Sequence, residues 1–281
     1  MAVVAVSLVI SSALVHALWN LFAKQSLDKV TFLFSIHIIN FIILLPYSVI
    51  EIQQVVLDGP GIIFLLGSMF FQVIYGFSLI RGYTVGELSL VYPILRGSAS
   101  LLIPLISVLF LGDHLTILGW VGLLLVVTGI FLMGSEGFKS GEKVGPSLLY
   151  ALAGGMAITG YTLSDKMLLD YISPFLLIQF QNFIHIIALL WPAVGSQKLK
   201  QEWVLNWKII IMGAFFVPGA YTLFLFAMKL ANVAQLAPMR EISIVFGAIL
   251  GALILKEKQG VRKALFSILI VIGIVILSIF G

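Results

Sequence analysis

The chain has 281 residues, of which 61% are hydrophobic and only 10% are charged, and its formal net charge is +4. This composition excludes a soluble globular protein, because so few charged residues cannot cover the surface of a soluble core. The absence of cysteine excludes disulfides and metal sites built on thiolates. The positive balance does not indicate nucleic-acid binding, because the basic residues lie between hydrophobic runs, where they set membrane topology.

Ten hydrophobic runs follow one another along the chain, each close to the roughly 20 residues that a helix needs to cross a bilayer. Helix is predicted for each, because a single span must satisfy its own backbone groups. The first run has no basic segment before it and is longer than the apolar part of a signal peptide, so we expect a retained helix. The predicted helices are 3–23, 30–50, 61–80, 87–111, 115–133, 146–164, 174–194, 209–228, 233–255 and 261–280.

Two connections are longer than the rest. Gly134–Gly145 is polar and glycine-rich, and it divides the chain into two sets of five predicted helices, while Gly195–Lys208 has the tryptophans and lysines of an interfacial segment. Twelve Lys and Arg residues lie on the side reached after the first helix and two on the other, with Arg96 and Arg240 inside spans. The positive-inside rule therefore predicts a multi-pass protein of the inner or plasma membrane with both termini outside the cytoplasm.

The two halves of the sequence resemble each other. Pro93 matches Pro238 at an offset of 145 residues, and Asn40 matches Asn182 at an offset of 142. Because five is an odd number, the second set of helices must enter the membrane with opposite polarity, as in the inverted repeats of transporters. We therefore expect an all-α integral membrane protein of two inverted five-helix repeats, 1–134 and 145–281, around a central cavity.

Two such five-helix halves resemble the ten-helix EamA-type members of the drug/metabolite transporter superfamily. The residues that carry the resemblance are Pro93, Gly112, Asp113, Gly119, Gly122 and Gly129 in the first half and Pro238, Glu257 and Gly273 in the second. The resemblance implies a basket of helices around a cavity lined by the third and fourth helices of each half. The chain departs from the family in its uncharged end, SIFG, where familiar members have a basic cytoplasmic tail, so import and export both stay open.

Three charged residues, Arg96, Arg240 and Glu241, lie well inside predicted spans. Each charge near the bilayer centre costs roughly 2.5–3.5 kcal/mol on insertion scales, so the three are expected inside the bundle. The planar guanidinium groups suit a carboxylate or phosphonate, and Glu241 is expected to pair with an arginine or to meet a substrate ammonium. Two alternatives stay open: a structural ion pair with the second arginine reaching toward the interface, and a proton-coupling role for Glu241.

Aromatic and amide side chains are expected to line the cavity together with these charges. The predicted substrate-binding residues are Arg96, Arg240, Glu241, Tyr92, Gln72, Tyr75, Tyr221 and Trp19. Pro93 and Pro238 are predicted hinges, because a proline in mid-helix frees a backbone carbonyl, although each is equally well explained as a passive kink. Interfacial anchoring is an equally good explanation for some of the tyrosines.

The remaining polar residues are expected to have structural roles. His16, His37 and His185 lie on separate predicted spans without HxH or HExxH spacing, so neither a metal site nor a cofactor is expected. They are expected to join helices by hydrogen bonds rather than to relay protons. Asp165 and Lys166 lie at the end of a predicted span and are expected at the membrane interface.

The sequence therefore predicts a secondary transporter of a small polar metabolite, an amino acid or another zwitterionic or anionic compound, working by alternating access in the lipid bilayer, with coupled protons as one option. No Walker loop and no catalytic constellation with workable spacing is present, so neither ATP hydrolysis nor another enzyme activity is expected. The alternatives are a multidrug exporter of lipophilic cations, which two intramembrane arginines argue against, and a lipid flippase. The GxxxG match Gly247–Gly251 can serve a homodimer or internal packing.

Overall fold

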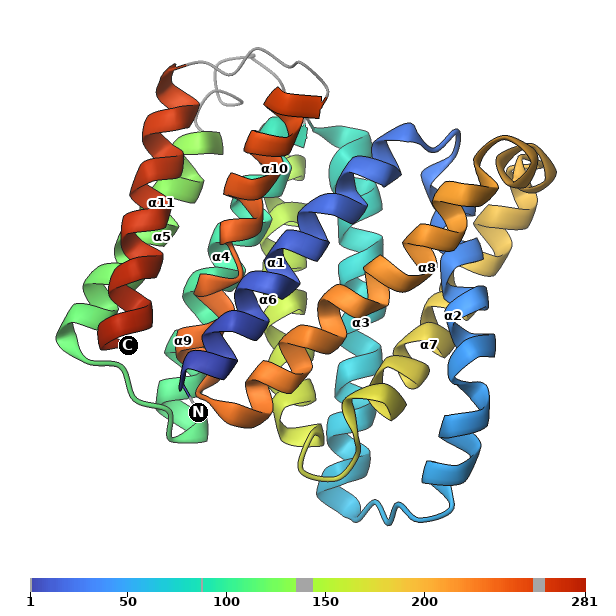
Figure 1. The fold of residues 1–281 in the computed structure, drawn as a ribbon, viewed down its shortest axis with the longest axis horizontal. Coiled ribbons are helices and arrows are strands. Elements are labelled where there is room, and N and C mark those ends of the chain that lie inside the picture. The colour runs from blue at the N-terminus through green and yellow to red at the C-terminus, as the bar shows by residue number, and fades with distance from the viewer. Residues whose placement is uncertain (1, 87, 135–143, 255–260) are drawn as a thin grey trace.

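The computed structural model describes residues 2–86, 88–134, 144–254 and 261–281. Within these ranges the chain forms helices and short connections and contains no strand, so the predicted all-α fold is confirmed. The helices are α1 (Ala2–Gln25), α2 (Lys29–Ile52), α3 (Gly59–Val85), α4 (Leu88–Ile106), α5 (Ile117–Gly134), α6 (Val144–Leu168), α7 (Pro174–Gly195), α8 (Leu199–Leu230), α9 (Val233–Met239), α10 (Ile242–Ile254) and α11 (Val261–Phe280) (Figure 1).

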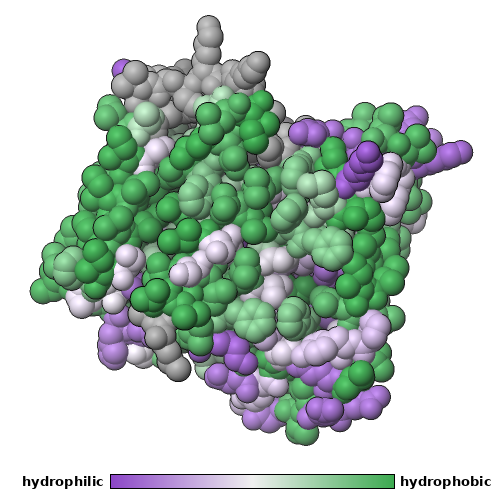
Figure 2. All heavy atoms as spheres, viewed as in Figure 1, coloured by the Kyte–Doolittle hydropathy of each residue, from purple (hydrophilic) through white to green (hydrophobic). Residues whose placement is uncertain are grey.

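Eight segments of the described chain are long and apolar enough to cross a membrane, and α11 contributes a shorter apolar segment, Ala264–Phe280. The sixth predicted span, 146–164, corresponds to α6 and is not among these segments, because its glycines, threonines and Asp165 lower its hydropathy. This helix packs against α3, α4 and α8 instead of relying on lipid contact alone. On the molecular surface, apolar side chains cover most of the face in Figure 2, and the most hydrophilic ones gather near its lower and upper right edges.

The two halves of the chain pack against each other in reciprocal pairs. The third helix of each half contacts the first helix of the other, as α3 packs on α6 and α8 packs on α1. Corresponding helices also contact each other, since α2 packs on α7 and α5 packs on α11. Such an exchange of equivalent positions is what a pseudo-two-fold axis between inverted repeats produces, and it places the centre of the bundle between the halves.

Two predicted spans are less regular than expected. The fourth, 87–111, consists of α4 and a π-helical turn, Ser107–Leu111, that follows Pro104 and ends at the left-handed Gly112 (φ 74°). The ninth, 233–255, is interrupted at Arg240 and Glu241 between α9 and α10. Pro238 lies just before that interruption, where it removes a helical donor, whereas α4 continues through Pro93. Whether either proline acts as a hinge stays a prediction.

The predicted connection Gly195–Lys208 is mostly helical, and its position at the membrane interface stays a prediction. α8 begins at Leu199 and changes direction at Asn206, whose backbone is not helical (φ −121°, ψ 18°). Glu202 in this first part is buried, and its carboxylate accepts hydrogen bonds from the Asp28 backbone N–H and the Asn206 amide, each at 2.9 Å. The other long connection, at residues 135–143, and the predicted helix end at Lys256 and Glu257 lie outside the described residues.

The contact between α5 and α11 depends on two glycines. A Cβ atom on Gly122 would lie 2.8 Å from the Gly273 carbonyl oxygen, and one on Gly273 would lie 2.6 Å from the Gly122 carbonyl oxygen. These atoms belong to the backbone, so a side chain at either position would push the helices apart. Small residues thus serve close packing here, as they do in other membrane bundles.

Replacing Gly273 with leucine is therefore expected to lower the melting temperature of the purified protein by several degrees, because overpacking a tight contact costs about 1–3 kcal/mol. The matched control is Gly247→Leu, since a Cβ atom on the exposed Gly247 meets no atom within 4 Å. Thermal unfolding followed by tryptophan fluorescence gives the comparison. Equal melting temperatures for the two variants would contradict the role assigned to Gly273.

Candidate functional site

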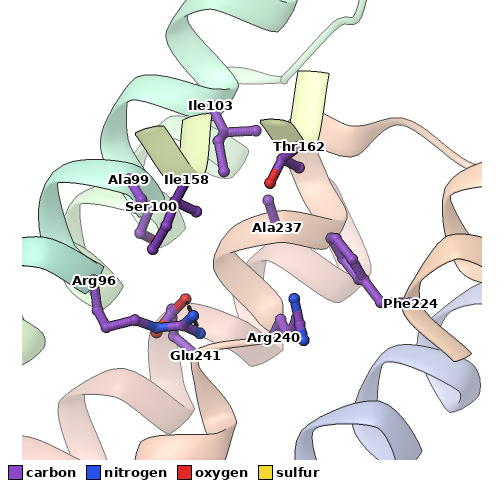
Figure 3. A pocket seen from close by; sticks show the side chains of 10 residues that line it. All are labelled: Arg96, Ala99, Ser100, Ile103, Ile158, Thr162, Phe224, Ala237, Arg240 and Glu241. Carbon is purple, nitrogen blue, oxygen red and sulfur yellow. Dashed lines mark hydrogen bonds and ion pairs between the residues drawn. The ribbon is translucent and has the colours of Figure 1, made fainter. Parts of the chain in front are cut away.

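A cavity lies near the centre of the bundle, where the two halves meet. Its lining comes from α4, α6, α8, α9 and the interruption between α9 and α10. The lining residues are Arg96, Ala99, Ser100, Ile103, Ile158, Thr162, Phe224, Ala237, Arg240 and Glu241 (Figure 3). The α4 members recur at intervals of three and four residues, so one face of that helix is directed at the cavity.

Arg96 and Glu241 form a buried, two-pronged ion pair across the cavity. The Arg96 Nε donates to Glu241 Oε2 at 2.9 Å, and its Nη2 lies 2.7 Å from Oε1. Their side chains are only 8% and 6% exposed. Paired hydrogen bonds of this geometry hold both groups in position and strengthen the attraction between their charges. The structure therefore brings together the two positions that the repeat aligns, and the pair as a whole is neutral.

Arg240 is buried beside this pair but is not part of it. Its guanidinium carbon lies 5.0 Å from the ring centre of Tyr221 and 4.7 Å from that of Phe224, both on α8. Among the described residues, its Nε has no hydrogen-bond partner. Aromatic faces attract a cation but do not satisfy its N–H donors as an oxygen does. In Figure 3 the Arg240 side chain is directed away from Glu241, so the helix interruption separates two consecutive charged residues.

A row of aromatic rings runs from α3 to α8 next to the cavity. The ring centres of Tyr75 and Tyr161 are 5.9 Å apart, those of Tyr161 and Tyr221 are 6.1 Å apart, and those of Tyr221 and Phe224 are 6.0 Å apart. Tyr75 and Tyr221 were predicted site residues. Tyr161, which lies between them, was not predicted as a site residue, because α6 has too little hydrophobic periodicity to show which face it buries.

The other predicted site residues lie outside the cavity lining. Gln72 is buried on α3, and Tyr92 lies one turn before Arg96 on α4. Trp19 donates from its indole N–H to His16 Nδ1 on α1 at 3.1 Å. The cavity thus gathers the three predicted charged residues, with Tyr221 stacked on one of them.

Asp165 corrects a prediction, because it is fully buried and not interfacial. α6 continues to Leu168, past the predicted end at residue 164, so the carboxylate lies inside the bundle. It accepts hydrogen bonds from Ser68 on α3 at 2.5 Å, Gln181 on α7 at 2.9 Å and Tyr221 on α8 at 2.5 Å. The sequence does not predict this burial, because a carboxylate near the end of a weakly apolar run is usually solvated.

Histidines and asparagines join α2 to α7. The rings of His37 and His185 stack with centres 4.5 Å apart, and His37 Nδ1 bonds to Asn182 Oδ1 at 2.9 Å. The Asn182 amide in turn donates to Asn40 Oδ1 at 2.6 Å, so two more positions aligned by the repeat are in contact. Within the described ranges, no group of three or more His, Cys, Asp or Glu residues is placed to hold a metal ion.

The burial of the Arg96–Glu241 pair leads to a prediction about stability. Arg96→Met and Glu241→Met are each expected to destabilise the protein by about 3–5 kcal/mol, because each leaves one buried charge without its partner. The double variant is expected to be more stable than either single variant, since it removes both charges. The melting temperatures of the four proteins test this, and strictly additive effects would show that the pair is not coupled.

Comparison with known proteins places this chain in a family. The sequence profile of the EamA-like transporter family matches residues 3–135 and 145–279. An uncharacterized transporter of Archaeoglobus fulgidus is 26% identical over 230 residues, which cover 78% of this chain and 80% of the relative. A protein solved by crystallography has the same fold, with a TM-score of 0.79 and 16% identity over 99% of both chains. The chain described here therefore belongs to the EamA-like transporter family.

Proposed function

We propose that this transporter carries a small anionic or zwitterionic metabolite, with amino acids as the leading class, and that it binds the anionic group at Arg240. The observation that carries the proposal is the buried Arg240 guanidinium, whose Nε has no hydrogen-bond partner among the described residues. A buried donor without an acceptor is costly, and a carboxylate or phosphonate would satisfy it.

The charges around the cavity favour an anionic group over a cation. Arg96 and Glu241 neutralise each other, which leaves the positive charge of Arg240 uncompensated by the other lining residues. A lipophilic cation would be repelled by this charge and would find the single lining carboxylate already occupied. The multidrug alternative is therefore disfavoured by charge, whereas a zwitterion could place its ammonium near Glu241 or a tyrosine ring.

The position of the cavity supports alternating access. Its lining comes from both halves of the chain, and relative movement of the halves would open it to one side of the membrane at a time. Because Arg240 and Glu241 lie at the interruption between α9 and α10, reorientation of these two segments would move both charges. Transport in this scheme follows a gradient or an exchange and does not use ATP. A lipid flippase would have the same fold, so the kind of ligand that binds distinguishes it from the proposed metabolite transporter.

A ligand screen tests the binding proposal. The purified protein would be heated with glycine, L-alanine, methylphosphonate, tetraphenylphosphonium or short-chain phosphatidylcholine. We expect an anionic or zwitterionic compound to raise the melting temperature, because ligand at a hundred times its dissociation constant stabilises the folded state by roughly 2.7 kcal/mol. Arg240→Gln is expected to abolish the increase. The matched control Lys229→Gln, which removes an exposed cation near the end of α8, is expected to retain it.

Arg240 is a better test residue than Arg96, because changing Arg96 also breaks a buried ion pair. Stabilisation by tetraphenylphosphonium alone would favour the multidrug exporter, and stabilisation by the lipid alone would favour the flippase. An unchanged response of Arg240→Gln to the anionic compounds would remove Arg240 from the binding site.

We also propose that both termini face away from the cytoplasm, as the distribution of Lys and Arg predicts. The chain has no cysteine, so single introduced cysteines report position without background. In intact cells, a membrane-impermeant maleimide is expected to label Gln54→Cys, between α2 and α3, and to leave Lys198→Cys, between α7 and α8, unlabelled until the cells are opened. The reverse pattern would place the termini in the cytoplasm.

A further inference from the structure

A second polar cluster lies beside the central cavity, with the Asp165 carboxylate at its centre. Its Oδ1 accepts a hydrogen bond from the Ser68 hydroxyl, and its Oδ2 accepts from the Gln181 amide and the Tyr221 hydroxyl. These partners come from α3, α7 and α8, so helices of both halves meet at one carboxylate. The ion pair at Arg96 and Glu241 does not include this cluster.

Asp165 has no counterion in the described part of the chain. The hydrogen bonds to its carboxylate come from uncharged groups. The neighbouring Lys166 is directed elsewhere, since its Nζ donates to the Met228 backbone carbonyl near the end of α8 at 2.5 Å. A negative charge on Asp165 is therefore stabilised by hydrogen bonds alone, whereas the negative charge of Glu241 is paired with Arg96.

The partners of Asp165 are compatible with both of its protonation states. As an anion, the carboxylate accepts three hydrogen bonds. As a neutral acid, it must donate one, and the hydroxyl of Ser68 or Tyr221 can accept it, because a hydroxyl is both donor and acceptor. Gain or loss of a proton thus requires rotation of a hydroxyl group and no movement of a helix.

Few other titratable groups face Asp165 from the surrounding helices. Tyr221 faces it from α8 and Tyr161 from α6 itself. α3 presents Ser68 and α7 presents Gln181, neither of which titrates. The histidine nearest along α7, His185, bonds through Nδ1 to the Gln181 backbone carbonyl at 2.7 Å and not to the carboxylate.

Tyr221 connects Asp165 to the central cavity. Its hydroxyl donates to Asp165, and its ring lies 5.0 Å from the Arg240 guanidinium carbon. The Tyr221 ring faces the positive charge of Arg240 while its hydroxyl donates to the Asp165 carboxylate, and a positive charge favours the anionic form of a carboxylate. A substrate anion bound at Arg240 would cancel that charge and remove the preference.

We infer that Asp165 is a proton-binding site linked through Tyr221 to Arg240, so that an anion bound at Arg240 favours proton uptake at Asp165. The inference rests on the proposed binding of an anion at Arg240 and adds that proton binding is coupled to it. Because linkage is reciprocal, a protonated Asp165 also strengthens anion binding. Substrate anion and proton are then bound together and released together, which is the requirement for symport.

The experiment that tests this inference needs no substrate. The full chain is reconstituted in liposomes, and pH-difference infrared spectra record the C=O stretching band of protonated carboxylic acids. Wild type is expected to show a band that disappears as the pH rises, and Asp165→Asn is expected to lack it. Asp113→Asn is the matched control, because Asp113 is also buried but bonds to Ser107 and to the Ala234 backbone N–H instead.

Two variants that keep Asp165 test the linkage and decide the matter if Asp165→Asn does not fold. Arg240→Gln is expected to move the midpoint of the band to higher pH by roughly one unit, since it imitates neutralisation by an anion. Tyr221→Phe is expected to move it in the same direction, because the anion loses one donor. Lys229→Gln, which removes an exposed cation near the end of α8, is expected to leave it unchanged.

The outcomes separate this inference from the proposed function. A band that persists in Asp165→Asn, or that is missing from wild type at every pH, overturns the assignment of Asp165. A midpoint that is the same in Arg240→Gln and in wild type overturns the linkage. Because these spectra contain no ligand, failure of the metabolite screen leaves them unaffected, and anion binding without a titrating Asp165 would retain the proposed function alone.

Discussion

The structure depends on one electrostatic constraint, which is that a charge in the bilayer interior must find a partner within the protein. Arg96 and Glu241 meet this constraint with two hydrogen bonds, and each comes from a different half of the chain. The pair therefore joins the repeats at their centre and also sets the charge of the cavity. Because the pair is neutral, Arg240 carries the uncompensated charge among the lining residues.

Arg240 and Asp165 meet the same constraint in a less complete way. Arg240 is held against two aromatic rings and keeps an unsatisfied donor, and Asp165 is held by three neutral donors. Groups that are buried but incompletely compensated are typical of functional sites, because a ligand or a proton can complete them. Tyr221 touches both groups, so the two incomplete sites are neighbours in one structure.

The sequence predicts the helices and the all-α fold well, because hydrophobic runs and backbone satisfaction in lipid leave few alternatives. It also identifies Arg96, Arg240 and Glu241, since charges inside apolar runs need an explanation. It fails at Asp165 and Tyr161, because both lie on α6, the least apolar of the helices expected to span the membrane. The burial of α6 is decided by its neighbours α3, α4 and α8, which no local pattern of α6 reveals.

The reciprocal packing of the halves has a consequence for biosynthesis. α1 has its main partner in α8 and α3 has its main partner in α6, so early helices enter the membrane well before the helices they pack against are made. The first five helices must therefore remain in lipid as a loose, incompletely packed intermediate until the second five arrive. During this interval, glycine-lined and polar helix faces would be exposed to the bilayer and to quality-control proteases. Completion of the chain would bury these faces.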